Sequence, residues 1–215
     1  SVSQKAGEYG IRQRVESLLQ PGDVIITRHD DALSNWFLPG FWPHGALYMG
    51  TEQQRRDLGL RLEPNHSQKA LDPFSVLEAK KDGVLFRPLT ETLHVDACTV
   101  LRPRMEDHER AEGLSRAATH EGKLYDFSFD FTRADRLVCT EVVYRAFHGV
   151  GPIHFGLRRH AGRLGLSPED VLDTAVDSDL FDVCCVYGVE GNNWIEGPNA
   201  RGALIDSYRA APAAR

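Results

Sequence analysis

The chain has 215 residues, 41% of them hydrophobic, which is enough for one ordinary core and excludes a disordered chain. Its net charge of −6 and its isoelectric point near 5.8 argue against nucleic-acid binding, which usually needs a basic face. Arg158, Arg159, His160 and Arg163 come nearest to a basic patch, and we interpret them as part of a solvated loop.

The cysteine pattern favours a reducing compartment, which we take to be the cytoplasm. The four cysteines (98, 139, 184 and 185) show no CxxC spacing, so neither a disulfide framework nor a zinc site is expected. No apolar stretch approaches the roughly 20 residues that cross a bilayer. The first residues lack the charged-then-apolar pattern of a signal peptide, although a leader removed before residue 1 would leave no trace here.

Strand signals dominate the first half of the chain. Helical spacing of apolar residues predicts a helix over residues 11–19, before Pro21-Gly22. The β-branched run at 24–26 predicts a buried strand, residues 45–49 predict another, and residues 51–72 are expected to form a helix or loop excursion. Further strands are predicted at 75–79, 84–88 and 98–101, the first two joined by the hairpin turn Lys81-Asp82-Gly83.

Helix signals dominate the second half. A polar amphipathic helix is predicted over 105–121, and the strongest helix over 134–148, where an apolar stripe ends at Gly149. Another helix is expected to begin at Ser167-Pro168, with Ser as cap and Pro at the first helical position. A strand over 181–189 and a frayed, Ala-rich tail over 203–215 complete the prediction. Strands followed by helices, without strict alternation, indicate an α+β fold with a mostly antiparallel sheet.

Cys139 lies near the N-terminus of the strongest predicted helix. The positive end of the backbone dipole there favours the thiolate, which is the nucleophilic form of cysteine. A buried cysteine that packs as a small hydrophobe is the alternative.

His44 and Glu78 are the candidate partners of this thiol. His44 opens a predicted strand, where a rigidly held imidazole can exchange protons with a neighbouring helix terminus, and Gly45 permits close approach. Glu78 interrupts an apolar strand, so its carboxylate faces either solvent or a cation such as a histidinium. His66 is the alternative orienting group, and an ordinary strand-end histidine is the alternative for His44.

The order of these segments resembles a known family. Residues of the matching segments are Pro21-Gly22-Asp23-Val24-Ile25, His44-Gly45-Ala46, Leu77-Glu78-Ala79 with Gly83-Val84, Tyr125-Asp126, and Val138-Cys139-Thr140-Glu141-Val142-Val143. They follow one another as in circularly permuted NlpC-type proteins, most closely the YiiX/YaeF-like branch, with similarity to a poxvirus group as well. The resemblance covers residues 20–175 and rests on the ordered set rather than on one motif.

This resemblance implies an α+β, permuted papain-like fold, with a mostly antiparallel sheet or small barrel packed against the cysteine helix. It implies a catalytic domain over 21–190, preceded by an N-terminal helix (1–20) and followed by a C-terminal tail (191–215). Cys139 would be the nucleophile, His44 the base and Glu78 the third residue. Tyr125 would place substrate or contribute to the oxyanion environment, or else simply pack. Glu141 would be structural.

The loop before His44 departs from the family pattern, because it is crowded with Trp36, Phe37, Phe41 and Trp42. Exposed rings there would form an apolar substrate-binding face or a lid, with Trp36 and Trp42 as contacts. The alternative is a satellite core under a long loop.

The first functional hypothesis is a cysteine amidase, peptidase or esterase that works through an acyl-thioester, without cofactor or metal. A lipid acyltransferase or phospholipase using the same site, and a non-catalytic binding module, are the alternatives. The expected partner is a small-molecule, peptide or lipid-like acyl substrate, with peripheral membrane contact if the aromatic loop is exposed, and not a nucleic acid. A metal site is disfavoured because no HExxH or Cys/His cluster occurs. The sequence leaves the acyl group, the leaving group and the oligomeric state undefined.

Overall fold

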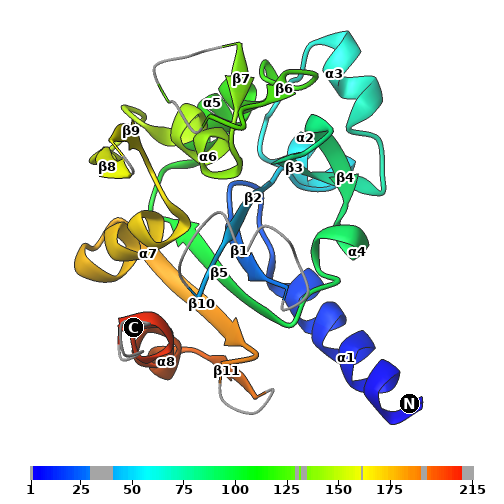
Figure 1. Ribbon diagram of the computed structural model, residues 1–215. Coiled ribbons are helices and arrows are strands. Elements are labelled where there is room, and N and C mark those ends of the chain that lie inside the picture. The colour runs from blue at the N-terminus through cyan, green and yellow to red at the C-terminus, as the bar shows by residue number, and fades with distance from the viewer. Residues whose placement is uncertain are drawn as a thin grey trace.

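The computed structural model describes residues 2–29, 41–128, 131, 135–160, 162–189 and 193–209, without the side chains of residues 2–9. A seven-stranded sheet crosses the molecule in the order β11-β10-β5-β1-β2-β3-β4 (Figure 1). Every neighbouring pair in it is antiparallel. Its strands are β1 (Val24–Arg28), β2 (His44–Tyr48), β3 (Phe74–Lys80), β4 (Gly83–Pro88), β5 (Ala97–Pro103), β10 (Phe181–Tyr187) and β11 (Trp194–Glu196).

Helices and two small sheets complete the described chain. The small sheets are the parallel pair β6 (Leu124–Tyr125) and β7 (Arg136–Leu137), and the antiparallel hairpin β8 (Arg158–His160) and β9 (Arg163–Gly165). The helices are α1 (Val2–Leu18), α2 (Glu52–Asp57), α3 (Pro64–Lys69), α4 (Leu89–Thr92), α5 (Asp107–Ala118), α6 (Cys139–Phe147), α7 (Pro168–Asp177) and α8 (Pro198–Arg209). None of the helices in the described segments has the length and apolar character needed to span a bilayer.

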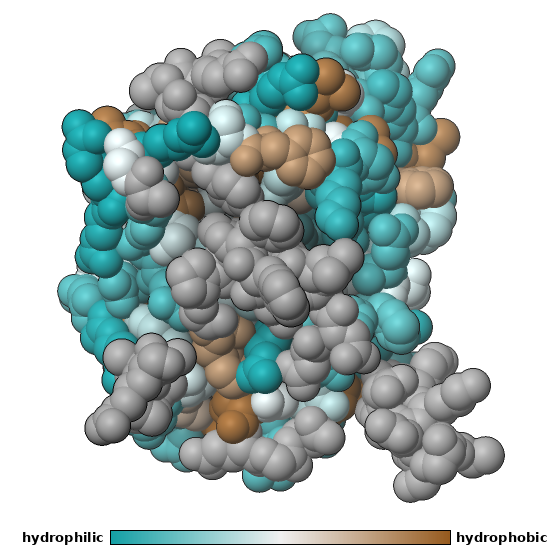
Figure 2. All heavy atoms as spheres, in the orientation of Figure 1, coloured by the Kyte–Doolittle hydropathy of each residue, from teal (hydrophilic) through white to brown (hydrophobic). Residues whose placement is uncertain are grey.

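Both faces of the central sheet are covered. Because successive side chains of a strand point to opposite faces, Ile26 joins the larger core under α5, α6, α7 and α8, whereas Ile25 joins a smaller core with α1. The far end of α1 projects from the molecule (Figure 1). On the face drawn in Figure 2, hydrophilic residues predominate among those coloured, and the apolar patches between them are small.

The predicted strands and the α+β class are confirmed, and the sheet is open, with β11 and β4 at the edges of the described sheet. The cap of α7 is confirmed as well, since the Ser167 hydroxyl accepts from the Asp170 N–H and the Asp170 carboxylate accepts from the Ser167 N–H.

Two expectations about helices are wrong. The strongest helix begins at Cys139 rather than at 134, because Arg136 and Leu137 pair with β6 as a strand. The expected frayed tail is ordered over 203–209, where it forms the end of α8, with Leu204 buried.

Candidate active site

Cys139 is the first residue of α6 and is only 2% exposed. The helix cap, Val138, offers no side-chain acceptor, so the first N–H groups of α6 are available to other acceptors. One of them, the N–H of Thr140, donates to the sulfur of Cys139. The Thr140 hydroxyl in turn donates to the carbonyl of Leu166 at 2.5 Å, which ties the start of α6 to the segment before α7.

His44 begins β2, directly beside this helix terminus. Gly45 permits the close packing: a Cβ placed there would lie 3.2 Å from Cδ1 of Ile26 and 3.5 Å from Cγ2 of Thr140. The N–H of Gly45 also donates to the sulfur of Cys139, so β2 supplies both a hydrogen bond and the imidazole to the thiol.

Glu78 lies in β3 and is completely buried. Nε2 of His44 donates to Oε2 of Glu78 at 2.6 Å, which leaves Nδ1 as the ring nitrogen for Cys139. The other carboxylate oxygen, Oε1, accepts from Thr92 Oγ1 at 3.1 Å and lies 2.8 Å from Nζ of Lys80 and 3.5 Å from Nε of Arg87. Three neighbours therefore hold one oxygen, and the other faces the imidazole.

These contacts decide the ionisation of the thiol and the imidazole. Burial alone would lower the pKa of His44, but its contacts with Cys139 and Glu78 outweigh burial and raise it to about 10. Burial alone would raise the pKa of Cys139, but His44 and the two backbone N–H groups lower it below its ordinary value. Burial would also raise the pKa of Glu78, yet His44 and Lys80 lower it to about 2. Both shifts favour a thiolate–imidazolium pair of Cys139 and His44, with the carboxylate of Glu78 ionised beside the imidazole.

Tyr125 reaches the same site from β6. The parallel pairing of β6 with β7 sets Tyr125 opposite Leu137, two residues before Cys139. Burial and the negative charge of Cys139 raise the pKa of the Tyr125 phenol, so this hydroxyl stays protonated and can donate. Its ring packs edge-on against Phe127 at 5.0 Å between centroids.

Glu141 is buried on the first turn of α6, two residues after Cys139. Its Oε1 accepts from Arg145 at 2.7 Å, and burial, only partly offset by Arg145, raises its pKa to about 7. These contacts agree with the structural role predicted for Glu141.

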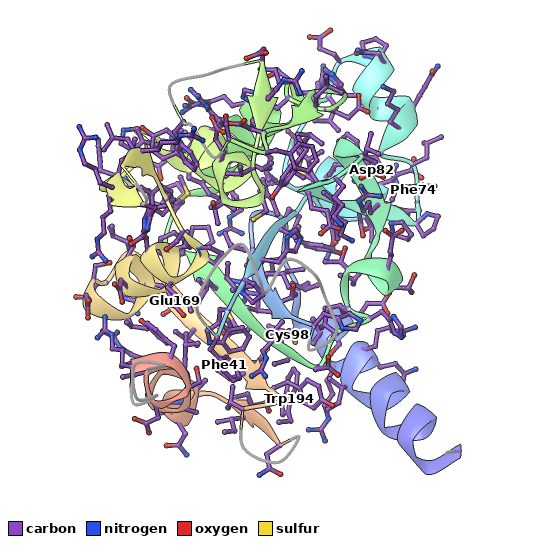
Figure 3. All side chains as sticks on the ribbon, in the orientation of Figure 1. Phe41, Phe74, Asp82, Cys98, Glu169 and Trp194 are labelled. Carbon is purple, nitrogen blue, oxygen red and sulfur yellow. The ribbon has the colours of Figure 1, made fainter. Side chains whose placement is uncertain are left out.

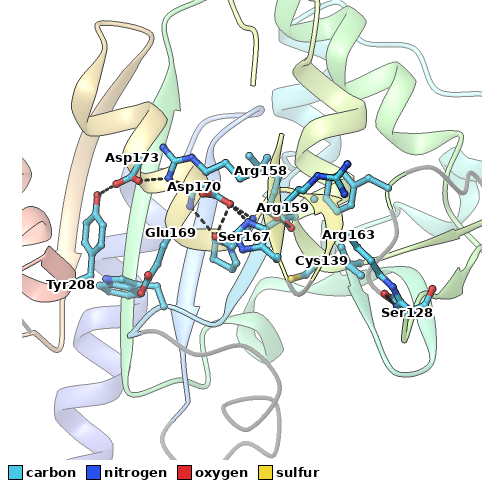
Figure 4. A pocket seen from close by; sticks show the side chains of 18 of the residues that line it. Ser128, Cys139, Arg158, Arg159, Arg163, Ser167, Glu169, Asp170, Asp173 and Tyr208 are labelled. Atoms are coloured by element: carbon cyan, nitrogen blue, oxygen red, sulfur yellow. Dashed lines mark hydrogen bonds and ion pairs between the residues drawn. The ribbon is translucent and has the colours of Figure 1, made fainter. Parts of the chain in front are cut away.

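A cleft of about 1120 Å³ opens at Cys139 (Figure 4). Its walls come from the segment around Phe127, from the β8–β9 hairpin, and from α7 with the end of α8. A substrate bound there would have the sulfur of Cys139 at its wall.

The described aromatic residues before His44 do not form the exposed apolar face considered in the sequence analysis. Trp42 is 1% exposed, and its indole N–H donates to Oγ of Ser207 on α8 at 3.0 Å, so it packs in the main core although it also lines the cleft. The N–H of Phe41 donates to Oε1 of Glu169 on α7 at 2.9 Å (Figure 3). Trp36 lies outside the described residues.

The structure thus brings Cys139, His44, Glu78 and Tyr125 together and leaves His66 apart on α3, where Asn65 contacts its ring. Sequence analysis missed Thr92, Lys80 and Arg87 around Glu78. Only the strand register of β3 and β4 and the short helix after them brings these residues together. Among the described residues, no three His, Cys, Asp or Glu side chains are arranged to hold a metal ion.

Comparisons with known proteins bear on the family and the fold. No curated protein matches the chain. The solved structure described as metalloprotein yiiX from Escherichia coli O157:H7 superposes with a TM-score of 0.50 at 18% identity, covering 85% of this chain and 91% of that one, which supports the shared fold. Residues 18–180 match the family described as permuted papain-like amidase enzymes, YaeF/YiiX. The chain therefore belongs to the C92 family of permuted papain-like amidases.

Proposed function

We propose that this protein is a cysteine amidase, with peptidase or esterase activity, that works through an acyl-thioester intermediate. The observation that supports this most is the position of His44, which contacts the sulfur of Cys139 on one side and the carboxylate of Glu78 on the other. This is the arrangement that nucleophilic catalysis by cysteine requires: a thiolate, a proton carrier and a group that orients the carrier.

In the first step, the thiolate of Cys139 attacks the substrate carbonyl, and a tetrahedral oxyanion forms. The backbone N–H of Cys139, at the start of α6, and the hydroxyl of Tyr125 are the donors that we assign to this oxyanion. The imidazolium of His44 then gives its Nδ1 proton to the leaving amine or alcohol, the C–N or C–O bond breaks, and an acyl-thioester remains on Cys139.

In the second step, neutral His44 accepts a proton from water as the water attacks the thioester. The C–S bond breaks, the carboxylic acid leaves, and the thiolate–imidazolium pair is restored. Glu78 keeps the imidazole oriented throughout, and its fixed negative charge stabilises the imidazolium before and after the acyl-enzyme.

The acyl-enzyme is directly testable with p-nitrophenyl acetate, a simple activated ester. Intact-mass and peptide analysis should find an acetyl group on Cys139 that hydroxylamine removes, and Cys139→Ala should abolish it. Cys184→Ala is the matched control, because this partly exposed cysteine lies on β10 and should not carry the label. Equal labelling of wild type and Cys139→Ala would refute the proposed nucleophile.

An alcohol or amine acceptor in place of water would make the same thioester the intermediate of an acyltransferase, whereas a phospholipid ester as the acyl donor, with water as the acceptor, would make it the intermediate of a phospholipase. Phe127, which lines the cleft and is 66% exposed, is the feature that favours an apolar acyl group or a lipid-like acceptor. Product analysis in the presence of glycerol or an alkylamine distinguishes the two fates, because transfer yields a new ester or amide and hydrolysis yields only the free acid.

A further inference from the structure

The β8–β9 hairpin places a row of cationic side chains along the cleft that contains Cys139. Arg158, Arg159 and Arg163 line it together with His160, and all four are exposed (Figure 4). The sequence suggested a solvated loop for this cluster, and the structure adds that the loop forms a wall of the cleft. In Figure 4, Arg159 and Arg163 lie in the same half of the view as Cys139 and Ser128.

The carboxylates of the cleft are already occupied by other partners. Asp170 accepts from His160 at 2.6 Å and pairs with Arg158 at 3.0 Å. Asp173 pairs with Arg158 at 2.9 Å and with Arg209 at 2.7 Å. The third carboxylate in the lining, Glu169, accepts from the backbone N–H of Phe41.

Two arginines are left over from this pairing. Arg159 donates to the carbonyl of Gly162 at 2.9 Å, and Arg163 donates to the carbonyl of Ser128. Within the described part of the chain, neither guanidinium contacts a carboxylate. Since a guanidinium has five donors, each keeps N–H groups that no described carboxylate accepts.

The contact of Arg163 with Ser128 connects this charge to the reactive centre. Ser128 is fixed in turn, because its N–H and hydroxyl both donate to Oδ1 of Asp126, the residue after Tyr125. Arg163 is thereby fastened to the segment that carries the phenol beside Cys139.

We propose that Arg159 and Arg163 bind an anionic group of the substrate, a carboxylate or a phosphate, while its carbonyl lies at Cys139. A guanidinium fork matches both groups and binds them through paired, charge-assisted hydrogen bonds. This inference rests on the proposed function, because it specifies the acyl substrate of that site as anionic. It makes the hairpin a determinant of specificity: the cleft selects against neutral analogues of the same shape.

The test compares two alkylating agents that differ in charge and little in size, iodoacetate and iodoacetamide, at Cys139. The rate with iodoacetate divided by the rate with iodoacetamide reports how strongly the cleft favours an anion near the sulfur. Replacing both residues (Arg159→Gln with Arg163→Gln) should lower the ratio by about twofold to fivefold for each charge at low salt, and 1 M salt should reduce the effect. The iodoacetamide rate itself should change little, which shows that the thiolate and the fold are intact.

Two controls separate local charge from other causes. Arg56→Gln removes the same charge from α2, outside the cleft lining, and should leave the ratio unchanged. Arg159→Lys with Arg163→Lys keeps the charge but loses the guanidinium fork, so its ratio should lie between those of wild type and the double Gln variant. An unchanged ratio in the double Gln variant, or an equal fall in Arg56→Gln, would each overturn the proposal.

Protection experiments distinguish the two anions. Succinate and inorganic phosphate are added separately during alkylation by iodoacetamide, and the better protector identifies the preferred group. Protection should be lost in the double Gln variant, and no protection by either anion in wild type would refute the site. Because alkylation needs only the thiolate, an anion preference in a protein that never forms the acetyl-enzyme would refute the proposed function and leave the anion site standing.

Discussion

Glu78→Gln replaces the carboxylate behind His44 with an amide of the same shape. In the native site, one oxygen of Glu78 accepts from His44 while the other accepts from Thr92 and Lys80 and faces Arg87. An amide cannot reproduce this, because its NH₂ group must face either the imidazolium or Thr92 and Lys80, and both sides carry donors. The substitution therefore removes the negative charge and also places the amide NH₂ group opposite another hydrogen-bond donor.

The effect on the thiol follows from the charges that remain. The Glu78–His44 contact is 2.6 Å long, and an opposite charge within about 4–6 Å shifts a pKa by about 1–3 units. Without Glu78, the cations of Lys80 and Arg87 would repel the imidazolium as well. Since each pKa unit corresponds to about 1.4 kcal/mol, we expect the thiolate–imidazolium pair to lose about 1–4 kcal/mol. The apparent pKa of Cys139 should rise by about 1–3 units.

Mass spectrometry of iodoacetamide-treated protein measures this directly, as the rate of Cys139 alkylation from pH 4 to pH 10. Wild type should remain reactive well below pH 8.5, the ordinary midpoint of a cysteine thiol, whereas the Glu78→Gln profile should move upward. Glu91→Gln is the matched control, because Glu91 also contacts Lys80 and Arg87, at 3.5 and 3.4 Å, but does not touch His44. Superimposable profiles for wild type and Glu78→Gln would refute the orienting role.

The same variant gives a stability test with a definite sign. The pKa of Glu78 is lowered from 4.5 to about 2 on folding, so its contribution is complete above pH 4.5 and is lost as the pH falls from 4.5 towards 2. Urea unfolding should show wild type more stable than Glu78→Gln at pH 6, by about 3 kcal/mol for a shift of this size. The difference should shrink towards pH 2, and a difference independent of pH would contradict the assignment.

Three further predictions address other parts of the site. Gly45→Ala places a methyl group 3.2 Å from Cδ1 of Ile26, so it should lower the free energy of unfolding by about 1–3 kcal/mol. It should also slow the alkylation of Cys139 at pH 6, and wild-type reactivity in this variant would contradict the close approach of β2 to α6. Tyr125→Phe should slow acylation by p-nitrophenyl acetate by about 10²-fold, as loss of an oxyanion donor does, while alkylation stays unchanged; wild-type acylation would exclude the phenol from this role. Burial raises the pKa of Glu141 from 4.5 to about 7, so the folded state binds the extra proton and stability should fall by about 3 kcal/mol as the pH rises from 4.5 to 7. Glu141→Gln should remove this slope in a series of urea titrations, and equal slopes would contradict it.

The three residues of the proposed mechanism could be selected from the sequence because each stands at a position with a local signature. Cys139 precedes a clear apolar stripe, His44 opens a strand, and Glu78 interrupts one. Their mutual contact was suggested only by family order, since nothing local requires β2, β3 and α6 to meet.

The surroundings of the site could not be predicted, because they depend on contacts between distant segments. The buried indole of Trp42 has its hydrogen-bond partner, Ser207, 165 residues away. The β8–β9 hairpin has exposed side chains on nearly every position, so it shows no alternation of polar and apolar residues. The Ala-rich end resembled a frayed tail, although Ala200 and Leu204 are buried and fix α8.

The chain order of the site has a consequence for synthesis. His44 and Glu78 lie on β2 and β3, so a nascent chain can form the antiparallel strand pair that joins imidazole and carboxylate before Cys139 leaves the ribosome. The thiol has its ordinary pKa until α6 packs against β2, because only then do His44 and the N–H of Gly45 reach it. Alkylation at low pH is thus a chemical reporter of the packing of α6 against β2, because the thiol of Cys139 gains its lowered pKa only when that contact has formed.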